Sequence, residues 1–299
     1  MTLHPDTAIA IADTDHPVLA RQALQHSLAG FPVGQVIVFS DRPEAWPGFD
    51  VVQVPTLRRI EDYNRLITRH LAEVLQRDRV LVIQYDGFVL NPAEYAPLFR
   101  HYDYLGAPWP QFADCGVGNG GFSLRSRRLV DAVARLDYAD LSEAEDLFIC
   151  RRSRPALEAA GLRFAPRAVA SHFSVEFPMV PWPTFGFHGI FHLPGVYRER
   201  LDFLIEHLSD RVLRSRADFL LPAITRLSAE AGAALRRRLA ALAASSPAPA
   251  ASVPIHESRL LGHLTHPRRG ADDAWAGPAR TAPVSACCSA LGLGGRCLD

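Results

Sequence analysis

Residues 80–90 read VLVIQYDGFVL, an apolar run that ends in polar side chains and a glycine. Val80 to Ile83 are all apolar, and three of the four are β-branched, which is typical of a strand covered on both faces. Gln84 and Asp86 follow, with Gly87 directly behind them. Because side chains two positions apart on a strand point the same way, we expect both to reach one ligand beyond the strand end.

The composition limits the classes of protein to which this chain can belong. The chain has 299 residues, 48% of them hydrophobic, which is enough for one sizeable core. Its formal net charge is zero, so it lacks the basic footprint of a nucleic-acid-binding protein. No lysine occurs. This excludes a Walker-type phosphate-binding lysine and a Schiff-base lysine.

Targeting and cysteine signals are weak. The five cysteines (Cys115, Cys150, Cys287, Cys288 and Cys297) form no CxxC pair, so neither a zinc site nor a disulfide framework is indicated. The N-terminus lacks a basic start followed by an apolar stretch, and no apolar run approaches the roughly 20 residues of a membrane span. The sequence predicts a cytoplasmic protein, with peripheral contact at the inner face of the membrane left open.

Strand and helix patterns alternate through the first half of the chain. Strands are expected at 7–12, 35–40, 50–55 and 80–83, and helices after Pro17, over 61–76 and over 91–102. Alternating βαβ order predicts an α/β fold with a doubly wound sheet, in which ligands lie beyond the carboxyl ends of the strands.

The pattern becomes irregular in the second half of the chain. A glycine-rich stretch (106–125) precedes an arginine-rich helix, another helix starts near Ser142, and 164–195 is expected to wrap over the sheet as a loop. We predict a catalytic domain over 1–195, a C-terminal helical segment over 196–244, and an Ala/Pro/Gly-rich, disordered tail over 245–299.

Asp86 has two interpretations. A carboxylate at a strand end can hold a divalent ion that bridges two phosphates. Alternatively, residues 84–87 form a turn in which Asp86 bonds to its own backbone and Gly87 supplies a positive φ.

The order of motifs resembles a family of glycosyltransferase-like domains that is catalogued as a domain of unknown function and placed with the GT-A nucleotide-sugar transferases. The motifs are YNRL (63–66), VLVIQYDG (80–87), YDYLGAPW (102–109), GVGNGGFSLR (116–125), AEDLFIC (144–150) and FGFHG (185–189), and the resemblance spans roughly 30–195. It implies a GT-A-like mixed sheet with flanking helices. In most GT-A enzymes the strand-end motif is Asp-x-Asp, whose final Asp binds Mn²⁺ or Mg²⁺ with the donor diphosphate. Here Gln84 replaces the first Asp, and Asp86 is the implied metal ligand.

The resemblance also implies roles for later residues. His188, in FGFHG, would be a second metal ligand, with His172 and His192 as alternates. Asp146 would be the catalytic base of an inverting transfer, with Glu145 as its orienting neighbour. A local alternative exists, because Ser142-x-x-Glu145 fits a helix capping box.

The glycine-rich run is expected to line the donor sugar through Gly118, Asn119, Gly120 and Gly121, since glycine lets the backbone approach a ligand closely. Its alternative is a tight connection between sheet and helix. Trp109 either stacks on a sugar or fills the core. Arg125 either faces the diphosphate or lies on a solvated helix face.

The resemblance also implies that four further residues contact the nucleoside, because GT-A enzymes usually hold it at these places. Asp13 ends the first strand, and Tyr63, Asn64 and Arg65 lie on the helix before the metal motif. For Asp13 the alternative is a helix N-cap.

Together these features predict a glycosyltransferase that moves a sugar from a nucleotide-diphosphate-sugar to a hydroxyl of a glycan or glycolipid, inverting and assisted by Mn²⁺ or Mg²⁺. Two other functions stay open: a non-catalytic nucleotide-sugar- or glycan-binding domain of the same fold, and a nucleotidyltransferase. The absence of lysine argues against the last. No nucleic-acid partner is expected.

Overall fold

The computed structural model describes residues 3–112, 116–138, 141–176 and 183–245. All of them belong to one unit that spans residues 1–256. Of the predicted tail, residues 246–299 lie outside the described residues.

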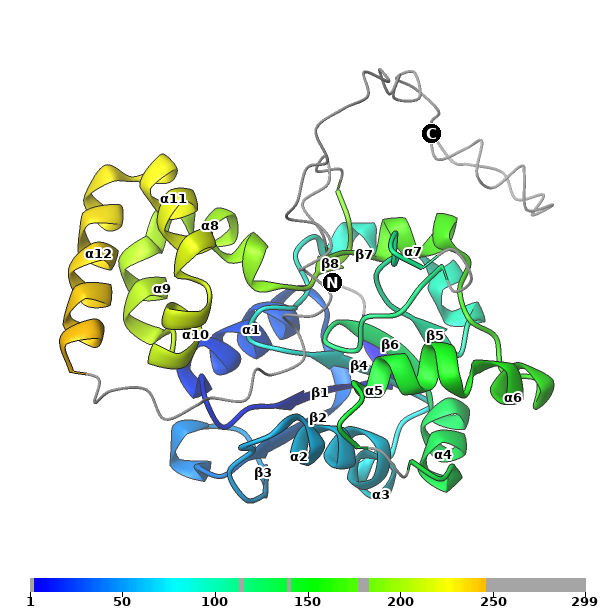
Figure 1. Cartoon of the computed structure of the whole chain (residues 1–299). Coiled ribbons are helices and arrows are strands. Elements are labelled where there is room, and N and C mark those ends of the chain that lie inside the picture. The colour runs from blue at the N-terminus through cyan, green and yellow to red at the C-terminus, as the bar shows by residue number, and fades with distance from the viewer. Residues whose placement is uncertain (1–2, 113–115, 139–140, 177–182, 246–299) are drawn as a thin grey trace, which may run out of the picture. The chain divides into compact units, whose positions relative to one another are not determined.

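A six-stranded sheet in the order β3-β2-β1-β4-β6-β5 forms the centre (Figure 1). Its strands are β1 (His4–Ala12), β2 (Val33–Ser40), β3 (Val51–Gln53), β4 (Arg79–Ile83), β5 (Tyr104–Leu105) and β6 (Ser123–Ser126). The first four strands are parallel to one another, whereas β6 runs antiparallel to β4 and to β5. The predicted α/β class, a doubly wound mixed sheet with flanking helices, is confirmed.

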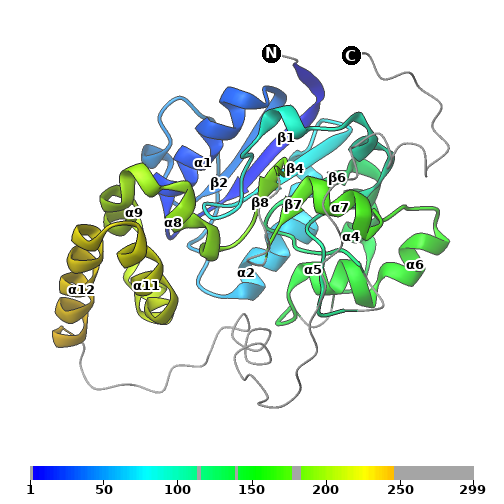
Figure 2. The same ribbon diagram turned by 90° about the horizontal axis from the view of Figure 1, so that it is seen from above.

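Helices and a small second sheet surround this sheet (Figure 2). The helices are α1 (Pro17–Gly30), α2 (Ile60–Arg65), α3 (Leu71–Val74), α4 (Arg127–Arg135), α5 (Glu145–Leu147), α6 (Arg154–Ala159), α7 (Arg167–Phe173), α8 (Leu193–Val196), α9 (Leu201–His207), α10 (Asp210–Ser215), α11 (Ala217–Leu227) and α12 (Ala229–Ala244). Strands β7 (Ser174–Val175) and β8 (Gly186–Phe187) pair in parallel, so the predicted loop over 164–195 contains a helix and two short strands.

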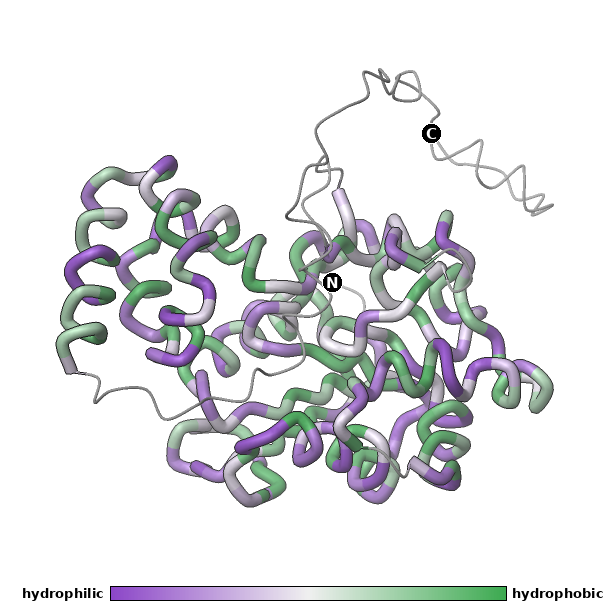
Figure 3. The backbone as a smooth tube through the Cα atoms, in the orientation of Figure 1, coloured by the Kyte–Doolittle hydropathy of each residue, from purple (hydrophilic) through white to green (hydrophobic). Residues whose placement is uncertain are grey.

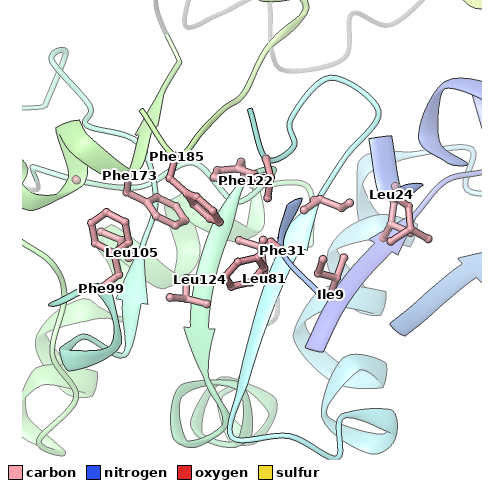
Figure 4. Close-up of a cluster of buried hydrophobic side chains, with 14 of the residues drawn as sticks. Ile9, Leu24, Phe31, Leu81, Phe99, Leu105, Phe122, Leu124, Phe173 and Phe185 are labelled. Carbon is pink, nitrogen blue, oxygen red and sulfur yellow. The ribbon is translucent and has the colours of Figure 1, made fainter. Parts of the chain in front are cut away.

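Alternation along the strands gives the sheet two apolar faces. Ala8, Ala10, Val80 and Val82 pack with residues of α3 and α4, whereas Ile9, Ile11, Leu81 and Ile83 pack with α1 and a group of phenylalanines. In Figure 4 the rings of Phe122, Phe173 and Phe185 meet beside β6. Figure 3 shows hydrophobic residues concentrated in the central strands.

The C-terminal helices form a separate apolar cluster. Leu204, Leu213, Leu220 and Leu235 from α9 to α12 pack together and against Leu19 of α1. Among the described residues, no helix is both long and apolar enough to cross a bilayer.

The helix predicted over 91–102 is wrong. The chain there makes two short 3-10 turns, Pro92–Glu94 and Pro97–His101. Pro97 has no backbone N–H to donate and disfavours a helical conformation at Ala96, which is extended with φ −99° and ψ 133°. Pro97 therefore prevents one continuous helix.

Candidate functional site

The polar stretch that follows β4 is a tight turn. The Gln84 N–H donates to Gly87 O at 2.8 Å, and the Gly87 N–H donates back to Gln84 O at 3.1 Å. The turn interpretation of 84–87 is therefore correct in part, but Gly87 is not among the described glycines with positive φ, which are Gly48, Gly161 and Gly189. Gly87 is needed for space instead, because a Cβ there would lie 2.7 Å from the His188 ring.

A chain of hydrogen bonds joins this turn to two distant segments. His188, which follows β8, places Nε2 3.0 Å from Gln84 Oε1 and Nδ1 2.8 Å from Asn119 Nδ2. Gln84 in turn donates from Nε2 to the Tyr63 hydroxyl at 2.8 Å. Asp86 Oδ1 lies 3.8 Å from His188 Nε2. Gln84 and Asp86 thus lie near one imidazole, and they do so from a turn that follows the strand.

The glycine-rich run packs tightly against its own protein. Asn119 takes a positive φ of 64°. A Cβ at Gly118 would lie 2.2 Å from the Trp109 ring, one at Gly120 1.8 Å from Glu145 Oε1, and one at Gly121 2.2 Å from His188 Nε2. The missing side chains therefore make room for protein groups, which is the tight-connection alternative. Trp109 is 3% exposed and belongs to a core cluster, so it fills the core.

Arg125 and Glu145 form a buried ion pair. Arg125 lies in β6 and not on a solvated helix face, so that alternative is wrong; its side chain is 2% exposed and that of Glu145 is 4% exposed. The guanidinium donates to the Glu145 carboxylate at 2.8 and 3.2 Å and also to Gly120 O at 3.2 Å. This pair holds the glycine-rich run against α5.

The capping box predicted at Ser142-x-x-Glu145 is also wrong. Helix α5 begins at Glu145, and its N-cap is Ala144 and not Ser142. The Glu145 carboxylate is taken by Arg125, and the Glu145 N–H donates to Asn64 Oδ1 at 3.2 Å.

Asp146 lies beside the same run. Its carboxylate accepts from the Gly120 N–H at 3.0 Å and from the Leu147 N–H at 2.8 Å. Burial, and then the charge of Glu145, raise the pKa of Asp146 to about 6, while the two backbone hydrogen bonds and Arg125 oppose this shift. A helix N-terminus would lower the basicity of a carboxylate, but burial outweighs it here.

The three residues predicted from YNRL have different roles. Asn64 is buried and donates to Leu141 O and Glu143 O, both at 2.7 Å, so it fixes the segment before α5. Tyr63 ends the hydrogen-bond chain from His188. Arg65 is exposed.

Asp13, at the end of β1, is buried and accepts from the N–H groups of Asp15 and His16 at 2.9 and 2.5 Å. This is a local cap of the chain before α1, although the formal N-cap is His16. Burial raises the pKa of Asp13 to about 7, and the charges of Asp15 and Asp86 add to the shift, so the ends of β1 and β4 bring their carboxyl groups within electrostatic reach.

Sequence reasoning missed Glu176. Burial raises the pKa of its carboxyl group, while His188 and hydrogen bonding from Asn119 and Trp109 lower it, which places Glu176 beside the chain of hydrogen bonds. Its backbone oxygen is 2.9 Å from His192 Nε2, and His172 is exposed. No local motif marks a single acid after a two-residue strand, so no sequence signal pointed to it.

The predicted Mn²⁺ or Mg²⁺ ion does not fit these donors as they are arranged. Mn²⁺ and Mg²⁺ require unprotonated ligand atoms. His188 Nδ1 faces an amide nitrogen, which only donates, so the ring proton of the neutral imidazole belongs on Nε2, the nitrogen nearest Asp86. Nor do the described parts of the chain contain a group of three or more His, Cys, Asp or Glu residues that could hold a metal ion.

Comparison with protein families shows the family of this chain. A family described as "Protein of unknown function (DUF5672)" matches residues 37–188, about half of the chain and all of the site residues except Asp13. The chain belongs to this family. No curated protein matches the chain.

Several solved structures of glycosyltransferases are similar to this chain. The mannosyltransferase PcManGT from Pyrobaculum calidifontis, in complex with GDP-Man and Mn²⁺, is 12% identical over 87% of this chain and 80% of that chain, with a TM-score of 0.41. A glycosyltransferase involved in glycosylation of the major capsid of PBCV-1 is 9% identical over 62% of this chain and 93% of that chain, with a TM-score of 0.43. The galactosyltransferase LgtC, with donor and acceptor sugar analogs, is 11% identical over 61% of this chain and 87% of that chain, with a TM-score of 0.36.

Proposed function

We propose that this protein is an inverting glycosyltransferase that moves a sugar from a nucleotide-diphosphate-sugar to a hydroxyl group of a glycan or glycolipid. One observation supports the proposal: an imidazole and a carboxylate contact successive residues of one loop. Asn119 bonds to His188, and the next residue, Gly120, bonds through its N–H to Asp146. Neighbouring Cα atoms are about 3.8 Å apart, so the imidazole and the carboxylate flank the same short stretch of backbone.

Asp146 has the properties of a general base in this proposal. Its pKa of about 6 leaves it ionised at neutral pH while making it a stronger base than an ordinary aspartate. The acceptor oxygen would bond to the anomeric carbon as its proton passes to Asp146. The bond between that carbon and the nucleoside diphosphate would break, and the electron pair would leave with the phosphate oxygen.

The other predicted residues take supporting roles. Asp13, at the neighbouring strand end, would bind the nucleoside, and the diphosphate would lie at the 84–87 turn. Glu145 would orient Asp146 rather than react, since it is occupied by Arg125. No step of this transfer uses a divalent ion, because the donors around His188 do not fit one.

The test is a screen of nucleotide-sugars with the full chain. Thermal stabilisation identifies the donor, and release of nucleoside diphosphate is then measured with excess EDTA and with Mn²⁺. We expect one or a few donors to stabilise the protein and to be turned over. A donor that binds without any product on long incubation would overturn the proposal in favour of a non-catalytic binding domain.

A further inference from the structure

The donor and acceptor of each hydrogen bond in the chain through His188 can be assigned from one bond whose donor is certain. The backbone N–H of Phe122 lies 3.4 Å from Asn119 Oδ1. A backbone N–H only donates, so the oxygen of the Asn119 amide must face it and the NH₂ group must face the other way. The hydrogen bonding from Asn119 that lowers the pKa of Glu176 agrees, because a carboxylate accepts only from the NH₂ group.

The rest of the chain follows from this end. The Asn119 NH₂ group donates to His188 Nδ1 at 2.8 Å, so Nδ1 must be an acceptor. In a neutral imidazole the single proton is then on Nε2, because the hydrogen bond at one ring nitrogen fixes the other. Nε2–H donates to Gln84 Oε1 at 3.0 Å, and Gln84 donates to Tyr63 at 2.8 Å.

Glutamine at position 84 is compatible with this chain of hydrogen bonds. Its Oε1 accepts from His188 Nε2–H, and its Nε2 donates to the Tyr63 hydroxyl. A carboxylate at this position could accept from both groups, because a hydroxyl can also donate. The contacts therefore agree with Gln84 in place of the first Asp of Asp-x-Asp without requiring it.

We propose that His188 acts as a hydrogen-bond donor through Nε2–H to a phosphate oxygen at the 84–87 turn, and not as a metal ligand. The tautomer stands on the contacts alone, and only the identity of the anion rests on the proposed function. The phosphate oxygen would share or replace Gln84 Oε1 as the acceptor of this proton. Metal-ligating histidines show the opposite pattern, in which the second ring nitrogen donates to a carboxylate or carbonyl.

Nitrogen-15 NMR of the full chain tests the tautomer without any assay of activity. The His188 ring signals are identified by their loss in His188→Gln. We expect a protonated Nε2 and an unprotonated Nδ1 at neutral pH, and no selective broadening of this ring by Mn²⁺ alone. A protonated Nδ1, or broadening of His188 at Mn²⁺ concentrations that leave the other histidines sharp, would overturn the proposal.

Asn119→Asp is the matched variant. Aspartate has the same shape, still accepts from the Phe122 N–H and tolerates a positive φ, but it accepts a proton from Nδ1 where asparagine donates one. We expect the ring to switch to the Nδ1–H tautomer and the exposed Nε2 lone pair to gain affinity for Mn²⁺. An unchanged tautomer in a folded Asn119→Asp protein would contradict the assigned polarity.

Inorganic pyrophosphate tests the anion. With EDTA present, we expect pyrophosphate to shift the His188 Nε2 signal and to bind at least tenfold more weakly to His188→Phe, which keeps an aromatic ring and has no N–H donor. Equal binding by the variant, or binding that needs Mn²⁺, would overturn the phosphate role. If no nucleotide-sugar is turned over while these results hold, the proposed function fails and the assignment of His188 stands.

Discussion

Arg125 and Glu145 make two parallel hydrogen bonds, at 2.8 and 3.2 Å, inside the protein. Removing one member leaves the other as an uncompensated buried charge, which typically costs about 3–5 kcal/mol. The pair also joins β6 to α5, so it supports both the glycine-rich run and Asp146. Its loss should therefore affect the fold before it affects any chemistry.

We predict that Arg125→Met lowers the free energy of unfolding by about 3–5 kcal/mol in urea denaturation. Arg237→Met in α12 is the matched control, because Arg237 is exposed, and it should change this free energy by less than about 0.5 kcal/mol. Equal effects of the two substitutions would show that the ion pair does not stabilise the fold.

The raised pKa of Asp146 predicts the acidic limb of the pH profile. A general base works in its ionised form, so kcat/KM should fall tenfold per pH unit below about 6, and not below the usual value near 4. In Glu145→Gln the charge that raises this pKa is gone, and the limb should move to lower pH. A limb that stays in place in Glu145→Gln would rule out Asp146 as its source.

A side chain at position 121 should lower activity, because it would displace His188 and Gln84. A Cβ there would lie 2.2 Å from His188 Nε2 and 2.8 Å from Gln84 Oε1. We expect Gly121→Ala to fold but to lose about 10²-fold in kcat/KM, because small displacements of positioned groups are costly. The control is Gly195→Ala, whose Cβ would meet nothing within 4 Å and should leave kcat/KM unchanged.

Asn64 should stabilise the segment before α5. It makes three hydrogen bonds to that segment, through Leu141 O, Glu143 O and the Glu145 N–H. Asn64→Ala should lower the free energy of unfolding by about 1–3 kcal/mol and speed amide exchange at Glu145. The exposed neighbour Arg65 provides the comparison, since Arg65→Ala should do neither.

The sequence predicted the parallel strands well because their signal is local. Each has a short apolar run near its end with a polar residue at or just after that end, as after Ala12 and Ile83. It did not predict β6, because an arginine is usually a surface residue. The buried partner of Arg125 is Glu145, which lies twenty positions later in the chain. The helix over 91–102 and the capping box at Ser142 failed because a proline and a distant ion pair override local pattern.

In the candidate site, too, local motifs were predictable from the sequence and contacts between distant residues were not. Asp86, His188 and Asp146 were identified by motif, and the structure connects all three through residues 119 and 120. The partners that set their chemistry, such as the Phe122 N–H and Glu176, carry no signal in a single sequence. The position of the proton on His188 depends on Asn119, which lies 69 positions away along the chain, so it was not predictable from residue types.

The central claim, that Asp146 takes the proton of an acceptor in a sugar transfer, is tested most directly by nucleoside diphosphate release in Asp146→Asn. With the donor found by screening, this variant should bind the donor as the unsubstituted protein does and release product about 10²–10⁴-fold more slowly. The control Asp202→Asn, at an exposed position of α9, should release it at the full rate. Full-rate release by a folded Asp146→Asn protein would contradict the account.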